Sequence, residues 1–261
     1  MPTQDPWLAS RMHNRGQVAV AEGDLAPAVR RAVAEFLSAV RDGLGLDQTL
    51  TAAAGDAGSG PEPDWSGFPD EGLWRRLVQQ HIAPVWQTLW ARSYRNTAPD
   101  APTDAGTGRA TDEATALPDR LRTWPRTVWG RLRGAWRDGR ARGESPATLR
   151  AHLATLATLE GWDGSATTMT RTEVMTALNA GALAAALDEQ QRTRRPWTKT
   201  WLATDDTRTR TEHRAADGQT RSLSEAFTVG RARLQFPGDP RGPAHLVINC
   251  RCAAQYRPAP T

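Results

Sequence analysis

Apolar residues recur at three- and four-residue spacing along most of the chain before residue 195, which predicts a helical N-terminal half. The first stripe runs from Leu25 to Leu44, with Pro27 suited to a first helical turn. The second runs from Asp70 to Tyr94. Pro84 should kink or split that helix, because proline lacks the N–H that a helix interior requires. A third helical region spans about residues 118–142.

Polar segments without this periodicity separate the predicted helices. Residues 1–23 are polar and interrupted by proline and glycine, so we expect a flexible N-terminal arm. Residues 51–69 are rich in Ala, Gly, Pro and Asp, which is typical of a linker. Residues 96–117 contain almost no large apolar side chain and predict a second flexible connection.

The C-terminal part has a different pattern. Two helices are expected first, over about residues 145–161 and 170–191, with Ser145 as the cap of the first and Gly161 as its end. After Pro196 the hydrophobic pattern becomes that of short extended segments around one helical turn at Thr211 to Arg214. The extended segments are expected at 197–204, 222–229, 233–237 and 246–252.

These elements predict an α+β protein, with a helical N-terminal half followed by a small C-terminal domain of two helices and a short-stranded sheet. The expected parts are a flexible arm (1–23), a helical region (24–142) with linkers at 51–69 and 96–117, a C-terminal domain (145–256) and a frayed tail (257–261).

Composition and charge set limits on the class of protein. The net charge is +4 and the pI about 9.8, and Lys199 is the only lysine. Such a charge permits weak, salt-sensitive contact with nucleic acid, but we favour codon bias toward arginine and solvated surface faces over a dedicated nucleic-acid site as its explanation. No apolar run is long enough to cross a bilayer, and the N-terminus lacks the pattern of a secretory signal. Residence in a cytoplasm is the default expectation.

Tryptophan and arginine alternate in the third helical region. This pattern can support base stacking and phosphate contact, but at helical spacing it more often marks a buried stripe or a helix that packs on a protein partner. We favour the core or partner-helix interpretation. The tryptophans chosen as candidates for partner contact are Trp74, Trp86, Trp90, Trp129 and Trp136.

Both cysteines, Cys250 and Cys252, lie one residue apart near the C-terminus. A disulfide across so short a span would be strained. With His213 they are ligand types for zinc, and Asp217, Asp206 or Asp239 could supply an oxygen ligand. The competing interpretation is that His213 is a buried hydrogen-bonding residue and that the two thiols only pack.

The chemically distinctive residues form an ordered series that resembles the phage Mu F-like family, the minor head proteins of tailed phages. The resemblance covers roughly Ser145 to Cys252. It begins with an Arg-Thr-Glu element on a helix and ends with Asn-Cys-Arg-Cys. The residues that carry it are Arg171, Glu173, Trp201, Asp206, Arg208, Arg210, His213, Asp217, Gly218, Gln219, Pro237, Gly238, Asp239, Asn249, Cys250, Arg251 and Cys252.

The resemblance implies a low-copy minor capsid protein that acts by binding rather than catalysis. It implies a place in the capsid interior near the portal vertex, after assembly in the host cytoplasm, and a role in head assembly and DNA packaging or ejection. The implied partners are the portal protein, other head or scaffold proteins and packaged DNA, with no membrane. Zinc is the one cofactor that the residues suggest.

Two alternatives stay open at the level of sequence. One is an enzyme or toxin-delivery module, of the hydrolase or ADP-ribosyl type, that would use Arg171, Glu173, His213 and Cys250. No Walker loop, dinucleotide fingerprint or His-Glu-x-x-His motif supports it. We expect Arg171 and Glu173 to be structural, with Arg171 paired to Asp206 or Asp217. The other alternative is a zinc-stabilised DNA-binding protein.

Overall fold

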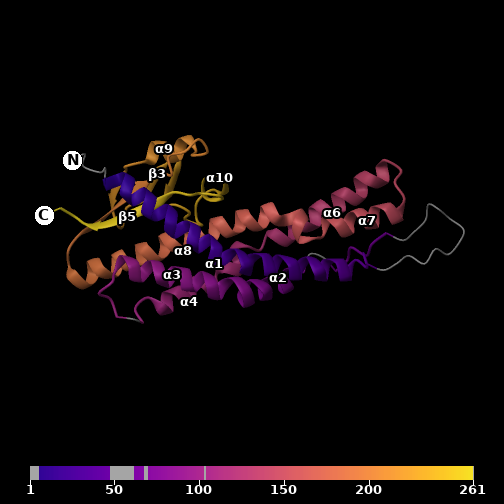
Figure 1. Cartoon of the computed structure of the whole chain (residues 1–261), viewed down its shortest axis with the longest axis horizontal. Coiled ribbons are helices and arrows are strands. Elements are labelled where there is room, and N and C mark those ends of the chain that lie inside the picture. The colour runs from indigo at the N-terminus through magenta and orange to yellow at the C-terminus, as the bar shows by residue number, and fades with distance from the viewer. Residues whose placement is uncertain (1–5, 48–61, 68–69, 103, 261) are drawn as a thin grey trace, which may run out of the picture. The chain divides into compact units, whose positions relative to one another are not determined.

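The computed structural model describes residues 6–47, 62–67, 70–102 and 104–260, with side chains from residue 15 (Figure 1). Much of the expected linker at 51–69, the start of the expected arm and the last residue of the expected tail lie outside the described residues. The chain forms two compact units. Unit 1 contains Met1–Pro27, Ala83–Thr115 and Thr167–Thr261, and unit 2 contains Ala28–Ile82 and Ala116–Ala166. The units cut across the domain boundary expected near residue 145, because helices run from one unit into the other.

The first helix, α1 (Pro6–Gly43), replaces most of the expected flexible arm. The prediction over the described part of 1–23 was wrong because tertiary contacts outweigh the local polar composition. In unit 1, Ala21 and Leu25 are fully buried. Asp24 pairs with Arg92 at 2.9 Å, and Glu22 pairs with Arg171 at 3.1 Å. These contacts fix a segment that its own sequence would leave loose.

The helix expected from Asp70 to Tyr94 is split, as predicted. It consists of α2 (Glu71–Leu77), a π-helical turn η1 (Val78–Ile82) and α3 (Ala83–Thr97). Asp70 caps α2 by accepting a hydrogen bond from Leu73 N at 2.7 Å. The π-helical turn ends two residues before Pro84, whose missing N–H interrupts the ordinary hydrogen-bond ladder.

A helix also occupies part of the segment 96–117, which was expected to be flexible. This helix, α4 (Thr107–Thr115), buries Ala110 and Ala114, so small side chains form its packing face. Gly106 precedes it with φ of +76°, and an added Cβ there would lie 3.0 Å from the rings of Trp90 and Tyr94. The lack of large apolar residues therefore reflects close packing in unit 1 and not flexibility.

Unit 2 is built around aromatic side chains on helices. Its elements include α5 (Leu117–Arg120), α6 (Trp124–Ala141) and α7 (Pro146–Leu156). The Trp124 ring lies 5.3 Å from Phe36, 4.5 Å from Trp74 and 5.7 Å from Trp162 between centroids. Ser145 caps α7 by accepting from Thr148 N at 3.1 Å, as expected.

The helix α8 (Leu159–Thr193) is continuous. The sequence predicted a helix end at Gly161 and a new start near residue 170. Instead α7 ends at Leu156, and Gly161 lies in the first turn of α8. Glycine fits there because a Cβ added at Gly161 would lie only 3.0 Å from the Leu156 carbonyl oxygen.

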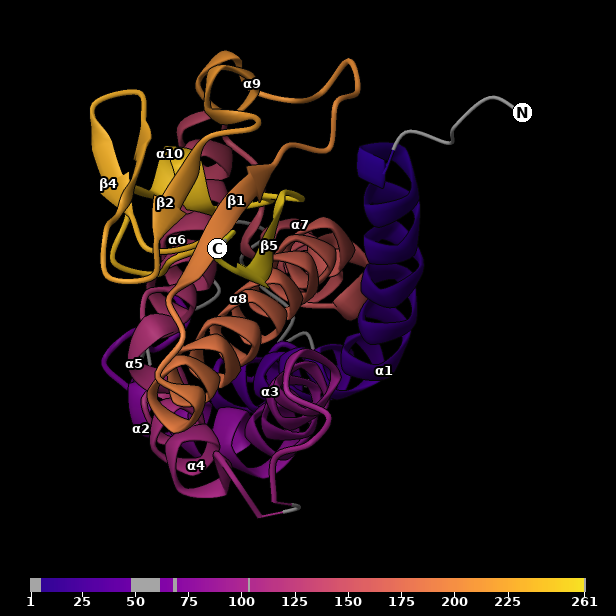
Figure 2. The same cartoon turned by 90° about the vertical axis from the view of Figure 1, so that its left-hand side faces the viewer.

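A three-stranded antiparallel sheet follows in unit 1, with strand order β2-β1-β5. The strands are β1 (Trp197–Leu202), β2 (Thr220–Ser222) and β5 (Ala253–Pro258). A separate hairpin pairs β3 (Phe227–Val229) with β4 (Ala232–Leu234). Figure 2 shows β1, β2 and β5 beside the C-terminal part of α8. The α+β fold class is therefore confirmed.

Two local expectations near the C-terminus were wrong. Residues 246–248 were predicted as a strand, but α10 (Ala244–Val247) is a short helix. Pro243 precedes this helix, and its Leu246 faces the core. The tail was expected to fray from residue 257, yet β5 runs to Pro258, and Ala259 N donates to Pro196 O at 2.8 Å.

Candidate functional site

His213 is held inside unit 1 by the short helix α9 (Thr211–Ala216), where the sequence predicted one helical turn. The side chain is only 2% exposed. The edge of its ring meets the Trp201 ring at 90°, with 5.5 Å between centroids. Trp201 also contacts Phe227, so the imidazole is anchored to the apolar core of the sheet.

Cys250 and Cys252 reach the same point from the segment between α10 and β5. Asn249 turns the chain there with φ of +58°, a conformation that non-glycine residues rarely adopt. Two hydrogen bonds to α8 hold this residue: its N–H donates to Thr172 Oγ1 at 3.0 Å and its Nδ2 to Thr168 Oγ1 at 3.3 Å. The turn brings both thiols to one side chain.

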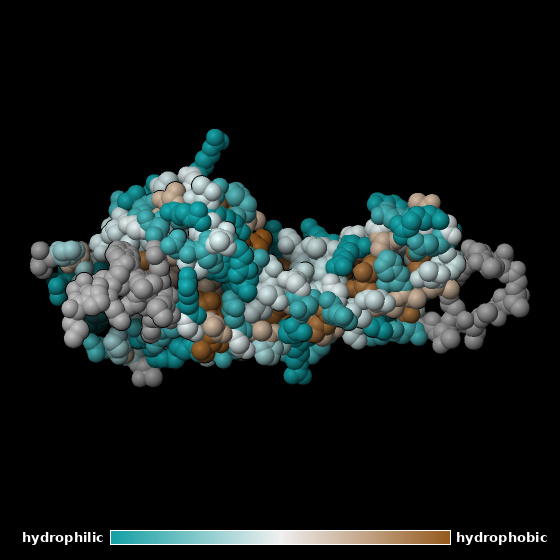
Figure 3. Space-filling model, turned by 45° about the horizontal axis from the view of Figure 1, so that its top comes forward, coloured by the Kyte–Doolittle hydropathy of each residue, from teal (hydrophilic) through white to brown (hydrophobic). Residues whose placement is uncertain are grey.

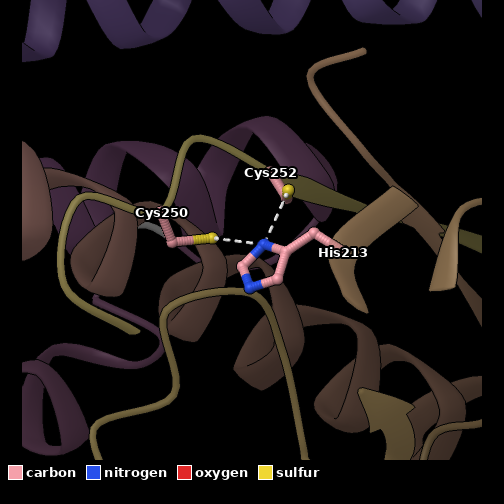
Figure 4. A group of neighbouring side chains, drawn as sticks. All are labelled: His213, Cys250 and Cys252. Atoms are coloured by element: carbon pink, nitrogen blue, oxygen red, sulfur yellow. Dashed lines mark hydrogen bonds between the residues drawn. The ribbon is translucent and has the colours of Figure 1, made fainter. Parts of the chain in front are cut away.

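The thiols of Cys250 and Cys252 converge on one imidazole nitrogen of His213 (Figure 4). His213 Nδ1 lies 3.3 Å from Cys252 Sγ and 3.7 Å from Cys250 Sγ. All three ligand atoms lie within 4.8 Å of one another, and Cys250 and Cys252 are 1% and 2% exposed. Both cysteines are free of disulfides.

The two thiols differ in acidity because each affects the other. The pKa of Cys252 is lowered, first by a hydrogen bond from Cys250 and then by one from His213. The pKa of Cys250 is raised, by the same interaction with Cys252 and by burial. Cys252 is therefore the more acidic of the two thiols, because it lies between the Cys250 thiol and the imidazole.

The carboxylates considered as oxygen ligands are engaged elsewhere. Asp217 Oδ1 accepts a hydrogen bond from Ala203 N at 2.8 Å. Asp206 forms a two-pronged ion pair with Arg251, which lowers the pKa of the Asp206 carboxyl. The buried Asp239 accepts from Gln235 N at 2.8 Å and from Arg241. Among the described residues, the cluster of possible metal ligands is therefore His213, Cys250 and Cys252.

Arg171 does not form the ion pair that we expected. It was predicted to pair with Asp206 or Asp217, but it pairs with Glu22 of α1, a segment that was thought to be a loose arm. Arg171 lines a cavity of about 220 Å³ together with Asp206 and Arg251. These charges are paired, and Arg15 donates to Thr204 O at 2.7 Å. The charged residues that line the cavity therefore form a structural ion-pair network. Glu173 is buried on α8, 4% exposed.

The other motif residues join loops to their neighbours. Gln219 pairs with the backbone of Thr228, accepting from its N–H at 2.7 Å and donating to its C=O at 3.1 Å. Arg210 donates to Ile248 O at 2.7 Å, and Arg208 N donates to Asp206 Oδ1 at 3.0 Å. Gly218 and Gly238 supply left-handed turns, with φ of +73° and +82°. Pro237 O accepts from Asn179 Nδ2 at 2.9 Å.

Two residues of this network were missed in the sequence. Asn179, 4% exposed on α8, donates to Pro237 O and Cys252 O and accepts from Ala254 N at 3.0 Å. Lys199, fully buried, donates to Leu223 O, Gln235 O and Gln235 Oε1. The signals were available: an amide inside an apolar helix, and the only lysine of the chain on the same side of a strand as Trp201.

Most of the tryptophans proposed for partner contact are buried. Trp74, Trp86 and Trp90 are at most 1% exposed and Trp136 is 6% exposed. They lie in the interiors of their own units, because an apolar stripe at helical spacing faces the core. The expectation that these four contact a partner is therefore wrong, because they are core residues. Trp129 is partly exposed.

Comparison with known proteins gives one match. Residues 131–255 match the family model described as phage Mu protein F like protein. No curated protein and no solved structure matches the chain. The matched segment contains all the residues of the ordered motif series, from Arg171 to Cys252, and the family indicates a role in phage head morphogenesis. Residues 131–255 are thus similar to the phage Mu F-like family, and this match supports the resemblance that the motif residues carry.

Proposed function

We propose that the protein is a minor head protein that acts at the portal vertex, in head assembly and in DNA packaging or ejection, by binding and not by catalysis. The family match over residues 131–255 carries this proposal, because it supports a head role and head proteins as partners. Portal contact and binding without catalysis go beyond the match. They rest on the features described next.

The matched segment has the chemistry of a structural domain. Its candidate nucleophile, Cys250, and candidate base, His213, are 1% and 2% exposed, which keeps them from a substrate. Arg171, Asp206 and Arg251 are neutralised in ion pairs. These features favour a binding role over the hydrolase or ADP-ribosyl alternative.

The surface is suited to contact with protein or nucleic acid. On the face shown in Figure 3, brown hydrophobic areas are separated from one another by hydrophilic side chains. No helix in the described part of the chain is long and apolar enough to span a membrane. Helix α6 carries the partly exposed Trp129, with the Arg133 guanidinium 5.7 Å from its ring centroid. We propose Trp129 as a contact residue for the portal protein.

Co-expression with the portal protein of the same phage tests the proposal. The full chain should co-purify with the portal on size exclusion and be present in purified virions, and Trp129→Ala should weaken the complex without unfolding the chain. Arg137→Ala on the same helix is the matched control, since that side chain is 81% exposed and pairs with its neighbour Asp138. Absence from virions together with no binding to any head protein would overturn the proposal.

Contact with packaged DNA is a separate arm of the same test. The net charge of +4 predicts retention on duplex DNA at low salt and release at moderate salt, because the contacts would be with phosphates. No retention at low salt would remove DNA from the list of partners. Assays for hydrolase and NAD-glycohydrolase turnover address the enzyme alternative, and the proposal predicts none.

A further inference from the structure

The cluster of His213, Cys250 and Cys252 has the donor set of a zinc site. One imidazole nitrogen and two sulfurs converge within 4.8 Å, from two segments 37 residues or more apart in sequence. Zinc in proteins is bound by cysteine thiolates and histidine nitrogens, and this soft donor set does not suit magnesium or calcium. We propose that His213 Nδ1, Cys250 Sγ and Cys252 Sγ bind one zinc ion.

The distances fit a tetrahedral site. Bonds of about 2.3 Å to sulfur and about 2.05 Å to nitrogen, at tetrahedral angles, place the nitrogen and each sulfur about 3.6 Å apart. The two observed Nδ1–Sγ distances, 3.3 and 3.7 Å, lie on either side of this value. Two edges of one face of a zinc tetrahedron thus have about the expected length, and the two sulfurs lie within 4.8 Å of each other.

The cluster also lacks the polar contacts that a metal-free interior would need. In the described part of the chain, Nε2 of the buried His213 has no hydrogen-bond partner. Nδ1 has only the two sulfurs, which are weak hydrogen-bonding groups. A buried imidazole with such poor compensation destabilises a fold. A zinc ion bound at Nδ1 would replace the two weak sulfur contacts there with a strong polar interaction.

The backbone around the cluster is fixed by contacts other than the cluster itself. Arg210, directly before α9, donates to Ile248 O at 2.7 Å, which joins the His213 segment to the cysteine segment. Arg251, between the two cysteines, is held by Asp206. Asn249 is anchored on Thr172. The ligands are therefore pre-positioned, as expected for a structural metal site.

The described residues provide three ligands, and a solvent molecule is assigned to the fourth position. The two carboxylates considered as oxygen ligands near His213 are occupied, with Asp217 bonded to Ala203 N and Asp206 to Arg251. Both sulfurs bind as thiolates, so binding releases to solvent any proton that a thiol still holds, and the two thiolates balance the two positive charges of zinc. The ion would cross-link α9 to the segment before β5 and stabilise the small sheet region.

Metal analysis of the purified full chain, without a histidine tag, tests the site. The wild type should carry one zinc per chain, and Cys250→Ser, Cys252→Ser and His213→Gln should each lose most of it. His245→Gln is the matched control, because His245 is an exposed histidine in α10 of the same region. It should keep the full zinc content. Equal zinc loss in this control would point to adventitious binding and contradict the proposal.

Two measurements on the wild type keep the test independent of variants that fail to fold. Cobalt(II) substitution should give sulfur-to-cobalt charge-transfer bands and the d–d bands of a tetrahedral site. X-ray absorption at the zinc edge should show two sulfur and two lighter ligands. A folded, reduced wild-type chain that contains no zinc and gives no sulfur bands after cobalt addition would overturn the proposal. So would a zinc ion without sulfur ligands.

Discussion

The two units of the molecule are stabilised by different kinds of side chain. Unit 2 has an aromatic interior, in which Trp124 contacts Phe36, Trp74 and Trp162. The seven buried polar or charged side chains among the described residues all belong to unit 1. They are Thr170, Glu173, Thr176, Asn179, Lys199, His213 and Asp239.

The two units differ in how their backbone N–H and C=O groups find hydrogen-bond partners. Helices satisfy their own N–H and C=O groups, so the helices of unit 2 can pack through apolar faces alone. The segment after Pro196 has short strands and many turns, and its backbone groups need other partners. Side chains provide them: Thr176 donates to Gly238 O, and Asp239 accepts from Gln235 N. Buried polar residues here replace missing secondary structure.

The largest expected effect comes from the aromatic core of unit 2. Trp74→Ala should lower the free energy of unfolding of this unit by about 3–5 kcal/mol, because it leaves a large cavity. Amide hydrogen exchange in α6 would measure the loss. Trp129→Ala is the control, since that ring is partly exposed and should cost much less. Equal losses would show that the tryptophans are not divided into core and surface as the structure indicates.

Asn179→Leu should break the polar network of unit 1 at its centre. The change fills a similar volume but leaves Pro237 O and Ala254 N without their partner. The expected loss is about 3 kcal/mol, since each orphaned buried group costs about 1–3 kcal/mol. Hydrogen exchange in β1 and β5 reports it. The exposed Asn96 provides the control Asn96→Leu. A stabilised Asn179→Leu chain would refute the idea that polar side chains hold this region.

The same contrast explains how much could be predicted from the sequence. Hydrophobic periodicity is a local signal, so it located the helices around Trp74 and Trp136 and the split at Pro84. It missed the start of α1, because Ala21 and Leu25 are buried through contacts with distant segments. A single buried polar residue produces no periodic pattern in the sequence. Asn179 acts on backbone groups 58 to 75 residues away, and this pairing cannot be derived from spacing.

The candidate site was predicted in part. His213, Cys250 and Cys252 were chosen by residue type and converge as the zinc hypothesis required. The oxygen ligand was not found, because Asp217 has the right chemistry but caps a backbone N–H instead. Residue type gives candidate ligands, whereas competition among hydrogen-bond partners decides which of them remain available.

Lys199 should make the stability of unit 1 depend on pH. Burial lowers the pKa of this lysine to about 8. Between that value and the unfolded pKa of about 10.4, the unfolded chain holds a proton that the folded chain has released, so stability rises with pH. Relative to Lys199→Met, the wild type should gain about 2 kcal/mol between pH 7 and pH 9.5 in denaturant unfolding. The difference caused by Trp74→Ala should stay constant over this range. If the difference in stability between the wild type and Lys199→Met did not change with pH, burial would not lower the pKa of Lys199.

The smallest effect concerns two ion pairs, one in each unit. Asp206 and Arg251 in unit 1 are 32% and 20% exposed, whereas Asp163 and Arg30 in unit 2 are 47% and 48% exposed. Asp206→Asn should cost about 1 kcal/mol at neutral pH, because charge-assisted bonds strengthen as solvent is excluded. The pairing lowers the folded-state pKa of Asp206, so this contribution is present above the unfolded pKa and disappears as the pH falls through the folded one.

Asp163→Asn should change the stability little at any pH, because water screens the exposed pair. Denaturant unfolding of both variants at neutral and strongly acidic pH compares them, and equal losses would mean that polar contacts do not distinguish the two units.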